Sequence, residues 1–261
     1  MHTLMIHDLK PEYFALPLRD YRLTFDDGLF SQYYYQPLLS GLGGELTFFI
    51  ATSLIRPGAL RPRFAGRHLA HVPSGTYSRR AFIERRLDDF MTEDEVAWLA
   101  AQPGVRLGAH SHFHDVILTD VHPRRPKPPS EWKLERCRDV PEDLRRGLSI
   151  RSRLAFQGFE YAGGRLAPRP EDRWREFIRE DTERCLDWFR RCLGLVPEAY
   201  CFPFNEYSPV LLEILRAYGF REFYASRAPR DATLVPRIDI DRLMEEGAPV
   251  AAERPCVRDR E

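Results

Sequence analysis

The sequence predicts an α/β fold with a mostly parallel sheet or barrel. Short apolar segments bounded by glycine, proline or charged residues alternate with amphipathic helical patterns, which is typical of strands joined by helices. The 261 residues are enough for one large α/β domain with a well-buried core. The sequence shows no internal repeat and no long low-complexity tract. We therefore expect a single domain over residues 1–261.

The strand candidates are short segments, each bounded by glycine, proline or charge. They are Tyr21–Phe25, Leu46–Ala51, Val105–Ala109, Ala199–Phe204, Glu222–Ala225 and Leu234–Ile240. Helical patterns separate most of them along the chain. This alternation favours parallel strands connected by helices.

Three helices have clear sequence signals at their ends. Thr92–Glu95 has the pattern of a capping box and opens the first of them. Glu171–Leu193 is long and amphipathic, and Gly194 closes it. Ser208 offers an N-cap and Pro209 occupies the first helical turn of the third.

The region of roughly residues 115–170 departs from this alternation. It is polar and arginine-rich, and a stretch of this length should not form a bare loop. Glu131–Arg138 and Pro141–Phe156 have helical content, so we expect an insertion that carries its own helices. We place it over the rim of the main domain and expect no second domain.

The bulk composition argues against several partners and locations. A formal net charge of +0 gives no global field that favours nucleic acid or an anionic membrane. The longest apolar run, Leu46 to Ile55, is far shorter than the ~20 residues of a spanning helix, so we expect no transmembrane segment. The N-terminus lacks a secretory signal pattern, and the five cysteines show no CxxC spacing. We therefore expect a cytoplasmic protein with reduced thiols. Nothing in the sequence indicates its oligomeric state.

The segment RLTFDDG, residues 22–28, ends a predicted strand with two adjacent carboxylates and a glycine. Neighbouring residues on a strand point to opposite faces, so one face cannot use both acids. At a strand end the chain turns, and both side chains can reach one cleft. A DDG sequence taken alone is also a common turn.

The second cluster is GAHSHFHD, residues 108–115, which overlaps and extends the predicted strand VRLGA. Imidazole is a good zinc ligand, and catalytic zinc sites usually combine three protein ligands with an open fourth position. His110 and His114 could bind one ion, with one carboxylate of RLTFDDG completing the set and the other free as a base. A solvated histidine-rich loop is the alternative, but two such clusters at strand ends favour a metal site.

These motifs resemble those of the NodB-type polysaccharide deacetylases, which are similar to carbohydrate esterase family 4. TFDDG, then HSxxH at residues 110–114, then the aromatic-Pro-aromatic strand end at residues 202–204 match the first three family motifs in order and spacing. The resemblance covers roughly residues 21–240 with the insertion set aside. It implies a distorted (β/α) barrel with a helical insertion after the HSxxH motif and the metal at the carboxyl ends of the strands.

The resemblance also implies roles for individual residues. Asp27, His110 and His114 would be the metal ligands, and Asp26 would be the general base that takes a proton from the attacking water. A bound zinc ion lowers the pKa of water and polarises the substrate carbonyl. Zn²⁺ is the expected metal, and Co²⁺, Ni²⁺ and Mn²⁺ are alternatives for a His/His/Asp site.

The third motif departs from the family pattern. The family usually has an arginine there that orients the base, whereas this sequence has Tyr200 and Cys201 before the aromatic pair. Arg237, on the last predicted strand, could hold Asp26 in place instead. A surface ion pair is the alternative for Arg237.

The fifth motif departs as well. The family usually supplies a histidine there as general acid, but no histidine follows His122 in this sequence. Asp239 could be the acid, with a raised pKa, and a surface ion pair is again the alternative. His112 and His122 are further candidates, for which a solvated loop is the alternative.

The residues after the third motif are candidates for substrate binding. Phe204 ends the motif, Asn205 suits a tight turn, and Glu206 could face the sugar. A loop that leads into the next helix is the alternative reading of this segment.

The sequence thus favours a metal-dependent carbohydrate N-deacetylase, which removes an N-acetyl group from an amino sugar. The expected substrate is a polysaccharide, or a lipid-linked or nucleotide-linked glycan, in surface-polysaccharide biosynthesis. One alternative is a hydrolase of other non-peptide C–N bonds in small amides. The other is a catalytically inactive glycan-binding protein.

Overall fold

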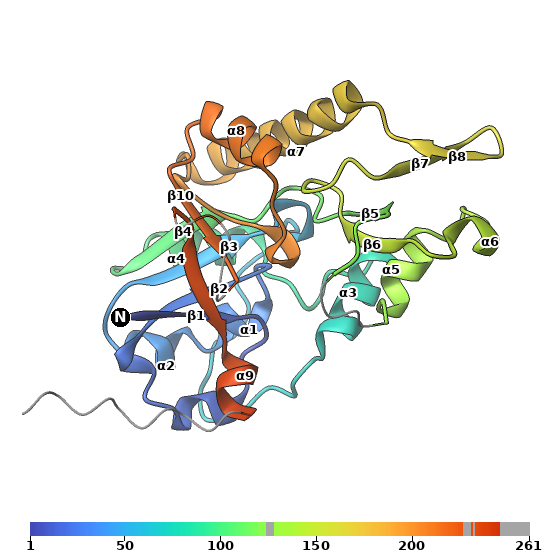
Figure 1. The fold of residues 1–261 in the computed structure, drawn as a ribbon. Helices are drawn as coiled ribbons and strands as arrows, with labels where there is room; N and C mark the ends of the chain where they lie inside the picture. Colours follow the sequence, from blue (N-terminus) through green and yellow to red (C-terminus); the bar gives the residue numbers. More distant parts are fainter. Residues whose placement is uncertain (124–127, 227–230, 232, 246–261) are drawn as a thin grey trace, which may run out of the picture.

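The computed structural model describes residues 1–123, 128–226, 231 and 233–245. Within them, parallel strands close into a barrel in the order β1-β2-β3-β4-β9-β10-β11 and back to β1 (Figure 1). The strands are β1 (His2–Ile6), β2 (Tyr21–Phe25), β3 (Leu46–Ile50), β4 (Val105–Ala109), β9 (Ala199–Cys201), β10 (Glu222–Ala225) and β11 (Val235–Asp239). The expected barrel is confirmed.

All six predicted strands are present, three of them with the predicted bounds. The segment predicted as Ala199–Phe204 is shorter, because the chain leaves the sheet at Phe202 and enters a 3-10 turn over Pro203–Asn205. Strand β1 has no counterpart among the predictions. Its apolar residues, Leu4 to Ile6, form a short run that no glycine or proline delimits, so its sequence signal is weak.

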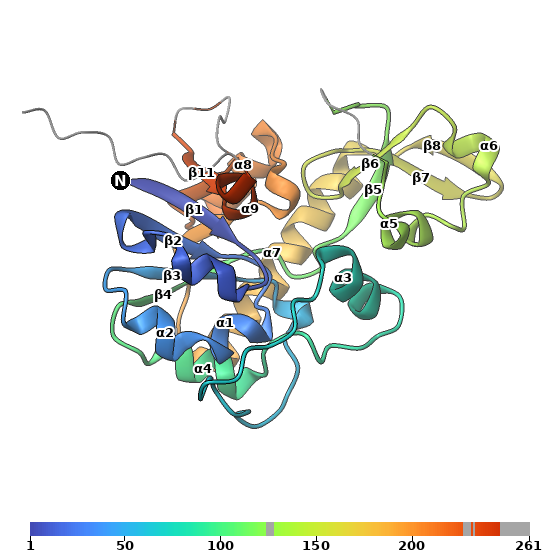
Figure 2. The same ribbon diagram turned by 90° about the horizontal axis from the view of Figure 1, so that it is seen from below.

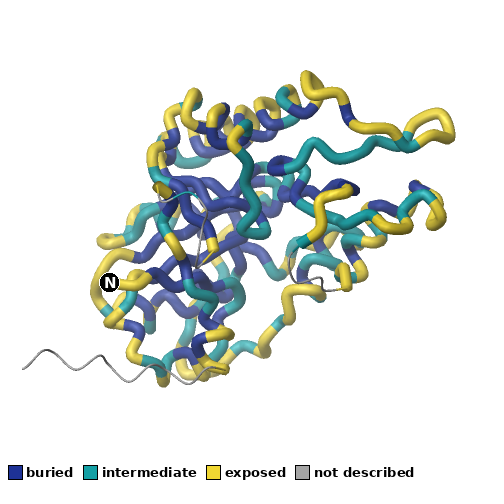
Figure 3. The backbone as a smooth tube through the Cα atoms, viewed as in Figure 1, coloured by how far each residue is buried: buried dark blue, intermediate teal, exposed yellow. Residues whose placement is uncertain are grey.

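The barrel core is built from strands that are buried on both faces. All five residues of β3, with the sequence LTFFI, are buried, as expected where helices cover the outside of a parallel barrel. Phe25 of β2 stacks on Phe48 of β3 with ring centroids 4.6 Å apart. Figure 3 shows the buried residues concentrated in this barrel.

The three helices with clear end signals form as predicted. Helix α4 (Glu93–Ala100) begins with a capping box in which Thr92 and Glu95 exchange hydrogen bonds. Helix α7 (Glu171–Leu193) ends at a left-handed Gly194, and Ser208 caps α8 (Pro209–Ala217). The other helices of the barrel part are α1 (Phe30–Tyr34), α2 (Gln36–Ser40), α3 (Ser74–Phe82) and α9 (Ile240–Glu245), with 3-10 turns at Pro11–Ala15, Leu18–Asp20 and Thr52–Leu54.

The insertion contains more strand than the sequence suggested. Its antiparallel sheet has the order β6-β5-β7-β8 and projects to one side of the barrel (Figures 1 and 2). The strands are β5 (Val116–Thr119), β6 (Ser149–Ser152), β7 (Phe159–Ala162) and β8 (Arg165–Pro168), and the helices are α5 (Glu131–Arg136) and α6 (Glu142–Arg145). The helical prediction for Glu131–Arg138 is confirmed for most of its length.

The helical prediction for Pro141–Phe156 is wrong beyond α6. Gly147 has a φ of 81°, which a right-handed helix cannot accommodate. The chain then forms β6, which pairs with β5 along its whole length. Long-range pairing with a strand some thirty residues earlier therefore decides the structure here.

Two further sequence expectations concern cysteines and membranes. Cys137, Cys185, Cys192 and Cys201 are free thiols. Cys256 lies outside the described residues. Among the described helices, none combines the length and the apolar character needed to cross a membrane.

The close approach of β3 to β4 gives a test of the barrel. A Cβ atom at Gly108 would lie 2.4 Å from Cε1 of Phe49. We expect Gly108→Ala to lower the free energy of unfolding by about 1–3 kcal/mol, because a buried ring must move. Chemical denaturation measures the change. Gly41→Ala is the control, because Gly41 has a helical φ of −71° and its Cβ would make only ordinary contact. Equal stabilities of the two variants would contradict this packing.

Candidate metal centre and active site

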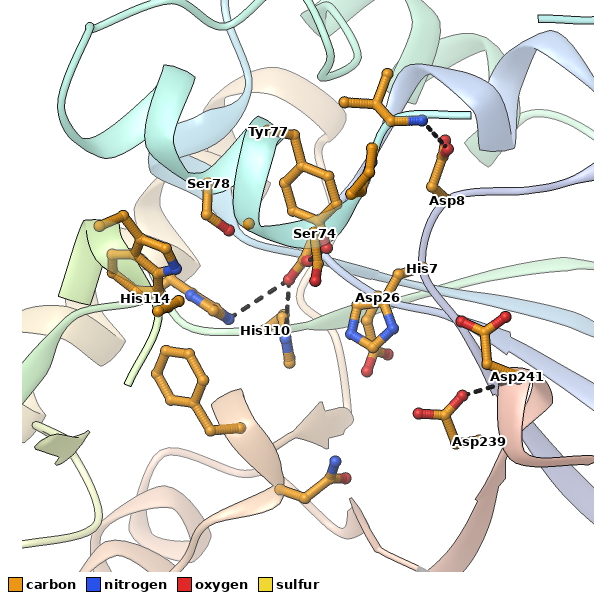
Figure 4. Close-up of a pocket in the computed structure, with 18 of the residues that line it drawn as sticks. His7, Asp8, Asp26, Ser74, Tyr77, Ser78, His110, His114, Asp239 and Asp241 are labelled. Carbon is orange, nitrogen blue, oxygen red and sulfur yellow. Dashed lines mark hydrogen bonds and ion pairs between the residues drawn. The ribbon is translucent and has the colours of Figure 1, made fainter. Parts of the chain in front are cut away.

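The candidate site lies at the carboxyl ends of the barrel strands, where barrel enzymes place their active sites. A cavity of about 470 Å³ opens there. The residues that follow β1, β2, β4 and β9 line it, together with the end of β11 and residues of α3 and α5 (Figure 4). Sequence segments more than 200 residues apart therefore meet in one cavity.

The two adjacent acids both reach this cavity because the strand ends between them. The backbone N–H of Asp26 still donates to the carbonyl of Ile6 at 2.9 Å. Asp27 then adopts a φ of 72° and Gly28 a φ of 82°, so the chain turns sharply. A left-handed aspartate is a strained conformation that is typical of functional sites. The turn expected for DDG and the use of both carboxylates are thus compatible.

Three potential ligand atoms converge at the base of the cavity. Nε2 of His110 lies 3.3 Å from Oδ1 of Asp27, and Nε2 of His114 lies 3.4 Å from the same oxygen. All three residues are buried. The sequence motifs RLTFDDG and HSxxH therefore meet in space as the hypothesis of a shared metal requires.

The hydrogen bond at the far side of His110 fixes the orientation of its ring. Nδ1 lies 2.9 Å from the carbonyl oxygen of Cys201, which can only accept, so Nδ1 carries the proton. In the neutral ring Nε2 then presents a lone pair to Oδ1 of Asp27, which has no hydrogen-bond partner among the described residues. Nε2 of His110 and Oδ1 of Asp27 therefore need a positive charge between them, which is either a proton on Nε2 or a bound metal ion.

The charge state of the cluster also suits a metal ion. Burial alone would raise the pKa of Asp27, but the two imidazoles outweigh it and hold that pKa well below its usual range. Burial lowers the pKa of His114 to about 4, so its ring is neutral at pH 7. Burial would lower the pKa of His110, but Cys201, Asp27 and Asp26 outweigh it and raise that pKa well above its usual value. Because metal ligands must be deprotonated, a bound metal ion would displace this proton.

The spacing fits zinc. Ligand atoms about 2.0–2.1 Å from a tetrahedral zinc ion lie about 3.3–3.4 Å from one another. The distances from Oδ1 of Asp27 to Nε2 of His110 and to Nε2 of His114 agree with that value. Three ligands leave a fourth position toward the cavity, so the donor set fits a catalytic divalent ion. Tyr77 of α3 donates to the other oxygen of Asp27 at 3.0 Å and orients the carboxylate.

Asp26 is held apart from this cluster by Arg237. The guanidinium donates to both carboxylate oxygens, at 2.7 and 2.8 Å, and both side chains are buried. Burial would raise the pKa of Asp26, but Arg237 outweighs it and the pKa is lowered. Of the alternatives left open by the sequence, a surface ion pair for Arg237 is wrong, since its partner is the buried Asp26.

Arg237 has further partners that fix its position. It lies 2.8 Å from Sγ of Cys201 and 3.2 Å from Oδ1 of Asn205. A second group of potential ligands, formed by Asp26, His110 and Cys201, therefore has a permanent cation beside it. That cation repels a metal ion, so the cluster at Asp27 is the one that fits.

The remaining predicted residues are placed differently. Phe204 and Asn205 line the cavity, whereas Glu206 does not. Glu206 accepts hydrogen bonds from the side chain of Arg151 at 2.6 Å and the backbone N–H of Ser152 at 2.7 Å. The expectation that Glu206 faces the sugar in this cavity is therefore corrected: it connects the insertion to the barrel.

The structure distinguishes the three candidates for the general acid by their positions. Asp239 lies at the cavity rim and accepts the backbone N–H of Asp241 at 3.0 Å (Figure 4). His112 is outside the cavity lining, and burial lowers its pKa to about 4. His122 is exposed beside Ser149 of the insertion. Of these three, only Asp239 faces the metal cluster's cavity.

Sequence reasoning missed His7, which follows β1 and lines the cavity with Asp26 and Asp27 (Figure 4). The sequence signal of His7 resembles that of Asp26 and Asp27, since His-Asp follows the strand segment TLMI as Asp-Asp follows the strand segment LTF. His71 also lines the cavity and pairs with Asp8 at 2.7 Å. Its segment carries no regular pattern that would have placed it here.

Asp181 was also missed, although its position is unusual. It lies within the buried, otherwise largely apolar face of α7. Its carboxylate accepts the backbone N–H of His112 at 3.1 Å and that of Phe113 at 2.8 Å. These residues lie between His110 and His114, so Asp181 holds the loop that positions both candidate ligands.

Solved structures supply a comparison for this arrangement. No family model and no curated protein matches the sequence. The chain is similar to a de-N-acetylase from Aggregatibacter actinomycetemcomitans, with a TM-score of 0.57 at 14% identity over 91% of this chain and 94% of that chain. It is also similar to the BpsB deacetylase domain from Bordetella bronchiseptica, with a TM-score of 0.58 at 17% identity over 92% of this chain and 94% of that chain. A third similar structure is IcaB from Ammonifex degensii, with a TM-score of 0.52 at 17% identity over 91% of this chain and 90% of that chain.

The chain has the NodB-like polysaccharide deacetylase fold. The family resemblance read from TFDDG and HSxxH is thereby confirmed for the fold. In this deacetylase fold the candidate cluster lies at the same barrel edge that the resemblance implied.

The contacts of Asp181 predict an effect on metal affinity in this deacetylase fold. We expect Asp181→Asn to weaken zinc binding by about ten- to a hundredfold, as outer partners of metal ligands do. Competition with a chromophoric chelator measures the affinity. Glu180→Gln is the matched control, because Glu180 lies next on α7, is half-exposed and pairs with Arg184 at the surface. Unchanged affinity in the Asp181 variant would show that other contacts suffice to hold the loop.

The same residue predicts a pH dependence of stability. Burial raises the pKa of Asp181 from 3.8 to about 7. Between these values the folded state keeps a proton that the unfolded state has released, so this group's contribution to stability falls as pH rises. Relative to wild type, metal-free Asp181→Asn should therefore gain stability between pH 5 and pH 8. Urea unfolding at both pH values measures the difference, and a constant difference would contradict the prediction.

Proposed function

We propose that this chain is a metal-dependent hydrolase that removes an N-acetyl group from an amino sugar of a glycan. The observation that carries the proposal is the buried cluster of Asp27, His110 and His114 beside Asp26, a carboxylate that Arg237 keeps ionised. The likeness in fold to proteins described as deacetylases supports the same reaction class.

The metal ion would be held by Asp27, His110 and His114. When bound, zinc or a similar divalent ion supplies Lewis-acid polarisation of the acetyl carbonyl and makes water more acidic. Zn²⁺ is the proposed ion, and Co²⁺, Ni²⁺ and Mn²⁺ also suit a His/His/Asp donor set.

Asp26 would be the general base. As water adds to the acetyl carbon, one of its protons passes to the Asp26 carboxylate. Arg237 holds both carboxylate oxygens, which fixes the base in place and favours its ionised form. Arg237 thereby performs the orienting task that the resemblance assigned to an arginine in the third motif.

We propose His7 as the proton donor to the leaving nitrogen. When the C–N bond breaks, that nitrogen must gain a proton to leave as an amine, and histidine is the most common proton donor in enzymes. His7 lines the same cavity as Asp26. It follows β1, which lies in the barrel between β2 and β11, the strand where the family pattern places its acid. Asp239, also at this rim, remains the alternative.

The proposed substrate is a glycan of surface-polysaccharide biosynthesis, whether a polymer, lipid-linked or nucleotide-linked. The cavity combines aromatic side chains with polar groups, as sugar sites require. Phe204 and Trp132 supply apolar surface, and Asn205 and Ser74 supply polar groups around the metal cluster.

Metal content tests the site. We expect about one transition-metal ion per chain in purified protein, and loss of that ion in the double variant His110→Ala/His114→Ala, because two of three ligands are removed. Elemental analysis after removal of excess zinc measures the content. His68→Ala/His122→Ala is the control, since neither histidine lines the cavity. Protein that takes up no zinc would favour the glycan-binding alternative.

The base is tested separately. We expect Asp26→Asn to keep its metal and to lose about 10²–10⁴-fold in kcat on an N-acetylated oligosaccharide, because proton transfer is removed. Acetate release measures turnover. Activity that survives in this variant would remove Asp26 from the mechanism while leaving the metal site intact.

The proton donor is tested by the leaving group. We expect His7→Gln to reduce hydrolysis of an N-acetylated sugar by about a hundredfold or more, because an alkylamine needs a proton to leave. For p-nitrophenyl acetate, whose phenolate leaves without one, the loss should be small. Asp239→Asn is run in parallel. The residue whose loss depends on the leaving group is the acid, and equal losses on both substrates for His7→Gln would exclude it.

A further inference from the structure

Lys133 of α5 projects from the insertion into the cavity that holds the metal cluster. It is the single lysine or arginine among the described residues that line this cavity. Its Nζ lies 4.1 Å from the centre of the Phe204 ring and 5.7 Å from that of Trp132. A lysine that lies on aromatic rings inside the proposed substrate cavity does more than keep the protein surface soluble.

Several of the acids around this cavity have basic partners. Asp26 pairs with Arg237, Asp8 with His71, and Asp241 with Lys10. In contrast, the ammonium group of Lys133 makes no ion pair and no hydrogen bond within the described part of the chain, and its contacts are with the two aromatic rings. Glu206 is the acid whose charge raises the pKa of Lys133, but both of its oxygens already accept hydrogen bonds from the insertion.

The ammonium group is also partly withdrawn from water. Burial lowers the pKa of Lys133, whereas Glu206 acts in the opposite direction. A lysine in this position gains most from an anion that enters the cavity, because a hydrogen bond between charged groups is shorter and stronger than a neutral one.

Helix α5, which carries Lys133, packs against α3. Trp132 is buried and stacks on Phe82 of α3 at 4.7 Å. Arg79 of α3 donates to Glu131 at 2.6 Å, at the start of α5. Helix α5 thus packs, mainly through Trp132, against the helix whose Tyr77 contacts the proposed metal ligand Asp27, and this packing places Lys133 beside the cluster.

The position of Lys133 also sets a length scale. The Phe204 ring centre lies 4.1 Å from Nζ of Lys133 and 4.6 Å from the ring centre of His114. The ammonium group is therefore at most 8.7 Å (4.1 plus 4.6) from a ligand of the proposed metal. A charged substituent on the acetylated sugar or on the neighbouring sugar can therefore reach Lys133 while the acetyl group lies at the proposed metal.

We propose that Lys133 binds an anionic group of the substrate, a carboxylate or a phosphate, carried on the N-acetylated sugar or on the sugar next to it. This inference rests on the proposed deacetylase function and specifies its substrate class. The insertion then serves as the element that selects an acidic glycan, while the barrel performs the hydrolysis.

Three probes separate the sources of negative charge. They are a neutral N-acetylglucosamine disaccharide, the same sugar linked to glucuronic acid, and N-acetylglucosamine 1-phosphate. Acetate release gives kcat and KM for each. Dissociation constants are measured in parallel by calorimetry on Asp26→Asn, in which turnover is removed, so that binding is tested even without hydrolysis.

For Lys133→Met we expect KM for an anionic probe to rise about ten- to a hundredfold, because a charge-assisted contact is lost. The neutral disaccharide should be unaffected, and kcat should change little for any probe. Lys133→Arg should retain the preference for the anionic probe. The preference in wild type should weaken as salt is raised. Arg165→Gln is the control, since it removes the same charge from an exposed position of the insertion.

The outcomes are distinct. A carboxylate is the recognised group if only the glucuronate probe responds to Lys133→Met, and a phosphate is recognised if only the sugar phosphate responds. Equal KM values and dissociation constants for neutral and anionic probes, in wild type and Lys133→Met alike, would overturn the inference. Protein that binds the anionic probes through Lys133 but hydrolyses none of the three would instead overturn the proposed function.

Discussion

The buried pair of Arg237 and Asp26 is the interaction on which the site depends. Arg237 stands on β11 and Asp26 follows β2, and 211 residues separate them in the sequence. Two buried charges are costly unless they are paired and hydrogen-bonded, and here the guanidinium donates to both carboxylate oxygens. Because β1 lies between β2 and β11, this pair joins the two strands across β1 at the edge where the metal cluster forms.

The pair also divides the work between two adjacent acids. Arg237 donates one hydrogen bond to each oxygen of Asp26, so its charge disfavours a metal ion there, while each oxygen keeps a further lone pair that can accept a proton. Asp27 lies in the turn that follows. One of its oxygens accepts a hydrogen bond from Tyr77, and the other has no hydrogen-bond partner among the described residues and faces His110 and His114. One carboxylate is therefore suited to a metal and its neighbour to a proton, although the two are consecutive in the sequence.

Features set by contiguous residues were predictable from the sequence, and features set by distant contacts were not. The strand ends at Phe25 and Ala109 carry their acids and histidines directly after them, so their meeting at one barrel edge followed from the parallel arrangement. Strand β6 was mistaken for helix because its partner β5 lies about thirty residues away. Lys133 and His71 reach the cavity only through tertiary packing, so no local pattern identified them.

The departures from the family motifs are best explained as a relocation of side chains within the site. The resemblance implied an arginine in the third motif, where this chain has Cys201. The guanidinium of Arg237 contacts Sγ of Cys201 at 2.8 Å, so the small thiol leaves room for an arginine that comes from β11, two strands along the barrel from β9. A protein that only bound glycans would have no use for a buried cation beside a carboxylate that is not a ligand. The presence of Arg237 in this position therefore favours a working base, and the missing motif residue does not imply a missing function.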